Sequence, residues 1–170
     1  MLLEAALRDP QLHVALVGAP LFGEDLYEAA LRAFVETHGM TSRVHFLGFR
    51  DDIAACMRAV DVVAHTSIAP EPFGRVIVEG MLAKRPVVAM RAGGVTEIVD
   101  DGMSGLLCEP DSADALSSAI TRLRTDAQLR TRLVETGYDV ARRRFGTGTY
   151  IDGVSRILAF HAASAAQRPR

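Results

Sequence analysis

Five short apolar runs, rich in valine and leucine, alternate along the chain with longer segments of helical periodicity, and this alternation constrains the fold more than any other feature. Apolar runs of strand length are typical of strands buried on both faces, and strands that alternate with helices form parallel sheets. We therefore predict an α/β fold, a Rossmann-like parallel sheet with helices on both faces. The predicted strands are residues 12–18, 44–48, 61–67, 86–90 and 105–108.

The segments between these runs have the spacing of amphipathic helices. Asp51 is predicted to cap one helix, and Asp111 with Ser112 to begin another, because side-chain oxygens at such positions accept hydrogen bonds from the free amides of a first turn. The predicted helices are residues 24–38, 51–59, 74–83, 95–100, 112–124, 126–144 and 150–160.

The chain has 170 residues, 49% of them apolar, which is enough for one domain with one core. We assign residues 1–145 to the Rossmann-like domain and residues 146–170 to a C-terminal helix and a frayed tail. A doubly wound domain normally begins with a central strand, whereas the first eight residues here have the pattern of a helix. The first strand of the domain is therefore expected to be missing.

Charge and composition exclude several classes of function. The formal net charge of -2 gives no broad field that would attract nucleic acid. The N-terminus lacks the basic start and cleavage site of a secretory signal, and charges interrupt every apolar stretch before the roughly 20 residues that a membrane span needs. We expect a soluble, cytoplasmic protein.

Metal and cofactor sites are not predicted. Cys56 and Cys108 lie far apart in apolar surroundings and are expected to be buried fillers. The five histidines lack the short spacings of a zinc site, and no cluster of carboxylates indicates calcium.

The segment from Glu71 to Glu79 carries the strongest chemical signal. Gly74, near the start of the helix predicted at 74–83, lets a ligand approach the free amides of the first turn, where the helix dipole favours an anion such as a diphosphate. At a rise of 1.5 Å per residue the two carboxylates lie on the order of 10 Å apart, too far for a retaining glycosidase pair at about 5 Å. They suit opposite ends of one ligand, since carboxylates accept hydrogen bonds from vicinal hydroxyls of a hexose or a ribose.

Two further loops follow predicted strands and are expected at the same edge of the sheet, where ligands bind in open parallel sheets. Phe49 and Arg50 follow residues 44–48, and Gly93 with Gly94 follow residues 86–90. Together with the carboxylates and the helix start, these loops predict a site for a nucleotide-sugar.

The chain resembles the GT-B glycosyltransferases of group 1, or family 4, specifically their C-terminal, donor-binding domain. The resemblance rests on the Glu-x7-Glu element from Glu71 to Glu79 within an ordered series that covers roughly residues 12–124. The other segments of the series are residues 59–63, 84–89, 93–99 and 101–107.

The resemblance implies roles for the site residues. Glu71 is the implied catalytic residue, which contacts the donor sugar and positions it without attacking it, and Glu79 binds the ribose hydroxyls. Backbone amides around Gly74 meet the sugar and the diphosphate. The implied donor-binding residues besides Glu79 are Phe73, Gly74, Arg75, Val76, Phe49, Arg50, Gly93 and Gly94.

The resemblance also implies an activity. Family members transfer a hexose from a nucleotide-diphosphate sugar to a glycan or lipid-linked acceptor with retention of configuration, usually without a metal. The leaving diphosphate is thought to help deprotonate the acceptor. A peripheral membrane association of the full enzyme is left open.

The chain departs from the family at its start. The first strand of a family C-terminal domain ends in Gly-Arg and is soon followed by Lys-Gly, and neither pair is present before residue 12. The N-terminal, acceptor-binding domain is absent as well. We expect the chain to be inactive alone and to need the N-terminal GT-B domain or a partner chain, with a split subunit or a non-catalytic nucleotide-binding module as the alternative.

The missing strand is central if the family strand order holds. Residues 12–18 and 61–67 are then left with unpaired edges. We expect a chain that rearranges, pairs with another chain or is poorly stable alone.

Several residues also have simpler interpretations. Arg75 is equally compatible with a surface ion pair, and Gly93 with Gly94 with a mere tight turn. Lys84 and Arg85 fit a solvated helix end better than a phosphate site.

Overall fold

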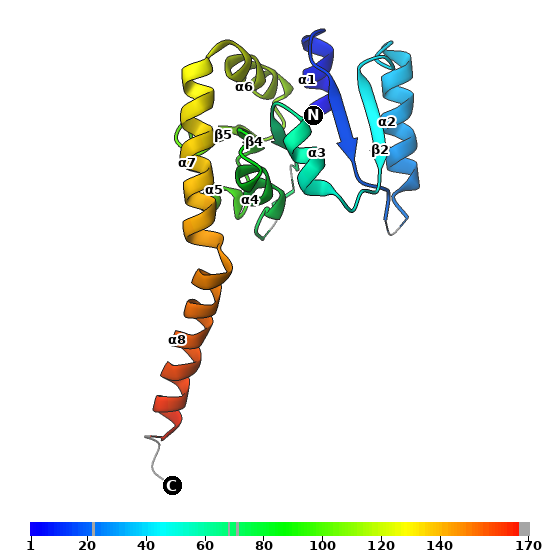
Figure 1. The fold of residues 1–170 in the computed structure, drawn as a ribbon. Helices are drawn as coiled ribbons and strands as arrows, with labels where there is room; N and C mark the ends of the chain where they lie inside the picture. The colour runs from blue at the N-terminus through cyan, green and yellow to red at the C-terminus, as the bar shows by residue number, and fades with distance from the viewer. Residues whose placement is uncertain (22, 68, 71, 167–170) are drawn as a thin grey trace.

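The computed structural model describes residues 1–21, 23–67, 69, 70 and 72–166, with side chains through residue 161. Five short strands alternate with helices, and each strand runs parallel to its neighbour (Figure 1). The predicted α/β class and the five predicted strands are confirmed. The strands are β1 Val14–Val17, β2 Val44–Gly48, β3 Val63–His65, β4 Val87–Met90 and β5 Leu106–Cys108.

The strands form two sheets. Within the described residues, β1 pairs only with β2, and β3, β4 and β5 form a separate sheet in that order. β4 is buried along its whole length, as expected for a strand with a neighbour on each side and helices on both faces. β1 and β3 are edges, which confirms the prediction made for residues 12–18 and 61–67.

Backbone hydrogen bonds show which way the two edges point. The N–H of Val14 donates to the carbonyl of Arg43 at 2.8 Å, and the N–H of Val63 donates to the carbonyl of Pro86 at 3.1 Å. Successive residues of a strand direct these groups to opposite sides. The backbone N–H and C=O groups of Ala15 and Ala64 therefore point away from β2 and β4.

The predicted helices are all present, with ends shifted by a few residues. The last helix is longer than predicted at both ends, and it extends away from the body of the molecule (Figure 1). Ser112 caps its helix as predicted, because its hydroxyl accepts from the N–H of Ala115 at 3.1 Å. The helices are α1 Leu2–Arg8, α2 Asp25–Thr37, α3 Ile53–Ala59, α4 Arg75–Leu82, α5 Val95–Ile98, α6 Ala113–Thr125, α7 Ala127–Phe145 and α8 Thr147–Ala166.

The buried apolar side chains form three clusters instead of the single predicted core. One cluster lies between α1, α6, α7 and one side of the β3–β5 sheet, and a second packs α4 and α5 on the other side. The third joins β1, β2, α1 and α2. Helix α1 contributes Ala5 to the first cluster and Leu3 with Ala6 to the third, so it packs against both sheets.

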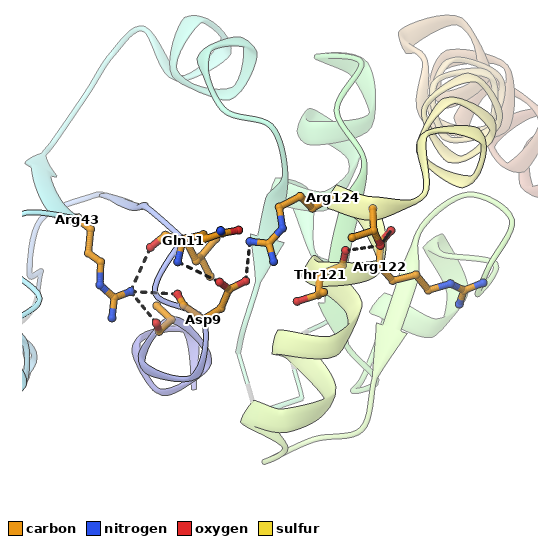
Figure 2. A network of polar contacts seen from close by, with 9 residues as sticks. Asp9, Gln11, Arg43, Thr121, Arg122 and Arg124 are labelled. Atoms are coloured by element: carbon orange, nitrogen blue, oxygen red, sulfur yellow. Dashed lines mark hydrogen bonds and ion pairs between the residues drawn. The ribbon is translucent and has the colours of Figure 1, made fainter.

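Polar contacts at the end of α1 connect it to the start of β2 and to α6 (Figure 2). The Arg43 guanidinium, just before β2, donates to the carbonyls of Ala6, Asp9 and Leu12 at 2.6, 3.4 and 3.2 Å. The Asp9 carboxylate, whose side chain is 10% exposed, accepts from the N–H of Gln11 and lies 2.8 Å from Nη1 of Arg124 on α6. These contacts hold α1 to both sheets.

We predict that Arg43→Ala lowers the free energy of unfolding by roughly 2 to 4 kcal/mol, because it removes charge-assisted hydrogen bonds and leaves partly buried carbonyls without that donor. Chemical denaturation would measure the loss. The matched control is Arg143→Ala, whose exposed guanidinium donates to the carbonyl of Asp139 in its own helix. Equal midpoints for the two variants would contradict a role for Arg43 in joining the sheets.

We predict uneven amide exchange in the purified monomer. Ala15 should exchange much faster than Val88 and Ala89, because its N–H points away from β2, the strand with which β1 pairs. Hydrogen exchange followed residue by residue by NMR would test this. Full protection of Ala15 and its neighbours in a proven monomer would show that the edge of β1 is covered.

Candidate functional site

Helix α4 begins at the edge of the sheet where β3 ends. Gly74 precedes it with φ 91° and ψ 50°, a left-handed conformation that a side chain rarely adopts. The helix is anchored because it buries Ile77, Val78 and Met81. The N–H of Ile77 donates to the carbonyl of Gly74 at 3.0 Å. The N–H groups that open a helix have no acceptor within it, and they suit an anion.

Helix α4 also approaches the sheet closely at Gly80. A Cβ added there would lie 3.0 to 3.1 Å from side-chain atoms of Val87 and Val63. The glycine inside the Glu-x7-Glu element thus sets the distance between the helix and strands β3 and β4.

The loop after β4 lies directly against the segment before α4. A Cβ added to Gly94 would lie 2.3 Å from the carbonyl oxygen of Pro72 and 3.1 Å from the Cα of Phe73. Thr96 closes the loop from the other side, because its hydroxyl donates to the carbonyl of Gly93 at 3.1 Å. The predicted convergence of these two loops is observed, and loop packing by itself accounts for a glycine at position 94.

Glu79 and Arg75 form an ion pair on the exposed side of α4. Arg75 Nε lies 3.0 Å from Glu79 Oε1, and the two side chains are 83% and 36% exposed. The surface pairing considered for Arg75 is therefore present. Because exposed pairs of this kind contribute little to stability, both groups remain available to a ligand. Both line a cavity of about 1460 Å³, as do Val76 and Arg50.

Arg50 is held at the cavity by Asp52. Its Nε and Nη2 donate to the two carboxylate oxygens of Asp52 at 2.8 and 2.7 Å. These hydrogen bonds raise the pKa of the Arg50 guanidinium and lower the pKa of the Asp52 carboxyl. The prediction that Asp51 caps α3 is wrong: Asp52 occupies the cap position and makes no side-chain cap bond, since its oxygens bind Arg50.

Phe49 and Phe73, both predicted to bind the donor, lie in different surroundings. The ring of Phe49 is 76% exposed beside Arg50 and does not line the cavity. Phe73 packs edge-on against Phe145 at the end of α7, with ring centroids 5.4 Å apart. Arg144, also on α7, donates to the carbonyl of Glu97 at 2.7 Å.

The C-terminal end of α7 thus supports both loops of the site. Sequence reasoning did not assign this role to Phe145 and Arg144. The only local signal was a run of three arginines that suited a solvated helix face.

The remaining candidates are Glu71, Lys84 and the two cysteines. Glu71 is not among the described residues, so its implied catalytic role stays a prediction. Lys84 adopts φ 56° after α4 and places Nζ 4.7 Å above the Tyr138 ring, which fits a helix end as predicted. Burial raises the pKa of the Cys108 thiol to about 11, in keeping with a core filler, whereas Cys56 is only half-buried.

The described ranges hold neither a metal site nor a membrane-spanning helix. No group of three or more histidine, cysteine, aspartate or glutamate side chains within the described ranges has the arrangement of a metal site. In the same ranges, no helix combines the length and the apolar character that crossing a membrane requires.

Residues 1–140 match the family described as Glycosyl transferases group 1. The chain belongs to this family. A lipopolysaccharide core biosynthesis glycosyltransferase, LpsE of Rhizobium meliloti, is 32% identical over 93% of the chain and 45% of its own length. The chain therefore spans less than half the length of this relative.

Solved structures of glycosyltransferases have the same fold. Anabaena Alr3699/HepE in complex with UDP-glucose superposes with a TM-score of 0.89 at 42% identity, over 93% of this chain and 44% of that one. The C-terminal domain of the group 1 family protein LpcC from Francisella tularensis has a TM-score of 0.76 at 28% identity, over 85% of this chain and 77% of that domain. This chain therefore has the fold of the C-terminal domain of a GT-B glycosyltransferase.

We predict that Gly94→Ala destabilises the protein by about 1 to 3 kcal/mol, because its Cβ would overlap the Pro72 carbonyl and push the two loops of the site apart. Thermal unfolding would measure the change. Gly153→Ala is the control, because a Cβ at that position of α8 meets no atom within 4 Å. A Gly94→Ala variant as stable as the control would show that the loops do not need this close contact.

Proposed function

We propose that this chain is the donor-binding domain of a retaining hexosyltransferase that uses a nucleotide-diphosphate sugar. The observation that carries the proposal is the convergence of three features at one edge: the start of α4 after Gly74, the Gly93–Gly94 loop packed on Pro72, and Glu79 beside it. An anion and a pair of hydroxyls are the groups that this arrangement suits.

Each part of the donor has a proposed partner. The diphosphate lies at the first-turn amides of α4, and Arg75 is close enough to share its charge. Glu79 accepts hydrogen bonds from the ribose hydroxyls. The Arg50 guanidinium, which is held in place by two hydrogen bonds to Asp52, lies along the base. UDP is the first nucleotide to test, because the HepE structure that is 42% identical to this chain is a complex with UDP-glucose.

The proposed reaction follows from the donor. The bond between the anomeric carbon and the diphosphate oxygen breaks, and a bond from the acceptor hydroxyl oxygen forms on the same face of the sugar. The proton of that hydroxyl passes to the leaving diphosphate. Glu71 is proposed to hold the donor sugar in position. No metal is required, since the helix start and arginines offset the diphosphate charge.

The acceptor, a glycan or lipid-linked molecule, is proposed to bind a second half of the enzyme. The relatives LpsE and HepE are more than twice as long as the part that matches this chain. The contacts proposed for the residues of this chain are all with the donor. We therefore propose that residues 1–170 bind a nucleotide-sugar without turnover until an acceptor-binding half is supplied.

We predict that Glu79→Gln weakens UDP binding about 10- to 100-fold, because it replaces charged hydrogen bonds to the ribose by neutral ones. Isothermal titration calorimetry with UDP would measure the affinity. The control, Glu36→Gln on the exposed side of α2, should bind like the wild type. Affinity should not change when EDTA is added. Unchanged affinity in Glu79→Gln would remove the ribose assignment, and loss of affinity with EDTA would contradict a metal-free site.

A further inference from the structure

The turn that leads into α4 is held from two sides. On one side the loop after β4 packs on Pro72, where a Cβ added to Gly94 would lie 2.3 Å from the carbonyl oxygen. On the other side Phe145, the last residue of α7, packs on Phe73 with the two ring planes at 79° to each other. Gly74, in its left-handed conformation, follows directly. Two neighbouring residues before the helix start therefore contact two different elements.

Helix α7 packs closely on α4, and this packing places Phe145. Gly137, Ala141 and Phe145 recur at every fourth residue, so they lie on one face of α7. Gly137 and Ala141 are buried, and a Cβ added to Gly137 would lie 3.3 Å from Cγ of Met81 on α4. Ala141 and Phe145 pack with the apolar cluster that also contains Ile77 of α4. The packing of the two helices therefore sets where the Phe145 ring meets the turn.

Arg144 connects the same end of α7 to the second loop of the site. Its Nη2 donates to the carbonyl of Glu97 on α5 at 2.7 Å, and its Cζ lies 5.2 Å from the centre of the Phe145 ring. Helix α5 begins directly after Gly94, so this contact leads back to the loop that packs on Pro72. The turn, the loop after β4 and the end of α7 thus form a closed set of contacts beside the start of α4.

The position of this turn decides where the free amides at the start of α4 point. Hydrogen bonds weaken steeply as their geometry departs from linear, so donors that bind an anion act best when they are held in place before it arrives. The Phe73 side chain is 44% exposed even though it contacts Phe145. Without the Phe145 ring, Phe73 would lose apolar cover and the turn would be held from the Pro72 side alone.

We propose that Phe145 and Arg144 are positioning residues for the donor diphosphate: through Phe73 and the Glu97 carbonyl they hold the free amides of α4 in the orientation that binds it. This role rests on the proposed function, because it takes the diphosphate as the ligand of this helix start. Neither residue lines the cavity described above, so both act without touching the donor. The end of α7 thereby sets donor affinity as well as stability.

Titrations with UDP and with uridine separate positioning from folding. Phe145→Ala should weaken UDP binding about ten-fold in calorimetry and leave uridine binding, measured by NMR, within about two-fold of the wild type, because uridine lacks the phosphates. Arg144→Ala should weaken UDP binding about three-fold, a smaller loss because its hydrogen bond is exposed. Arg143→Ala, the neighbouring control, should bind both ligands like the wild type. Unchanged UDP binding in Phe145→Ala, or equal weakening of UDP and uridine, would overturn the proposal.

Two more variants show through which contact Phe145 acts. Because Phe145 acts through Phe73, the double variant Phe73→Ala/Phe145→Ala should bind UDP as weakly as Phe145→Ala alone. Glu79→Gln, in contrast, should weaken UDP and uridine by similar factors, because both ligands contain the ribose. Losses that add in the double variant would overturn the proposal.

Inorganic pyrophosphate distinguishes this role from the proposed function, because it needs only the helix start. Phe145→Ala should bind pyrophosphate about ten-fold more weakly than the wild type does. Pyrophosphate binding that depends on Phe145, with no UDP binding, would support the positioning role and contradict the nucleotide assignment. UDP binding that is equal in the wild type and in Phe145→Ala would do the reverse. Binding of neither ligand to the wild type would overturn both.

Discussion

The contacts of helix α1 hold this structure together. Arg43 and Arg124 reach the end of the helix from opposite parts of the molecule, one from the start of β2 and the other from α6. Both bind at Asp9 or its neighbouring carbonyls, while Leu3, Ala5 and Ala6 pack into two clusters. The two sheets share no ladder of backbone hydrogen bonds within the described residues. The contacts of this short helix therefore connect them.

The division of the sheet explains why the core is also divided. β4 has strands on both sides and helices on both faces, and all four of its residues are buried. β1 has one neighbouring strand, and Val17 at its end is 39% exposed. An apolar side chain on a sheet edge is covered only when the next strand and its helix layer are in place. The exposure of Val17 therefore follows from the position of β1 at an edge of its sheet.

Most of the candidate donor site is built on the three-stranded sheet of β3, β4 and β5. Helix α4 packs on β3 and β4 through Gly80, and the Gly93–Gly94 loop extends from the end of β4 onto Pro72. The end of α7 braces both loops through Phe145 and Arg144. Arg50 comes from the other sheet, after β2, and reaches the same cavity as Glu79. The proposed base contact thus comes from the loop after β2, and the proposed ribose contact comes from α4, which packs on the other sheet.

The sequence alone determined the order of helices and strands, the Ser112 cap and the convergence of the loops, because apolar periodicity, capping and strand ends are local properties. It also predicted the two unpaired edges, through the family's strand order. Only the tertiary structure showed why position 94 is glycine, which of Asp51 and Asp52 begins α3, and how α1 joins the sheets. Each of these depends on an atom brought close by folding, such as the Pro72 carbonyl, the Arg50 guanidinium or the Arg124 side chain. A local sequence pattern does not predict these contacts, because it does not show which distant residue will lie next to a given carbonyl or guanidinium.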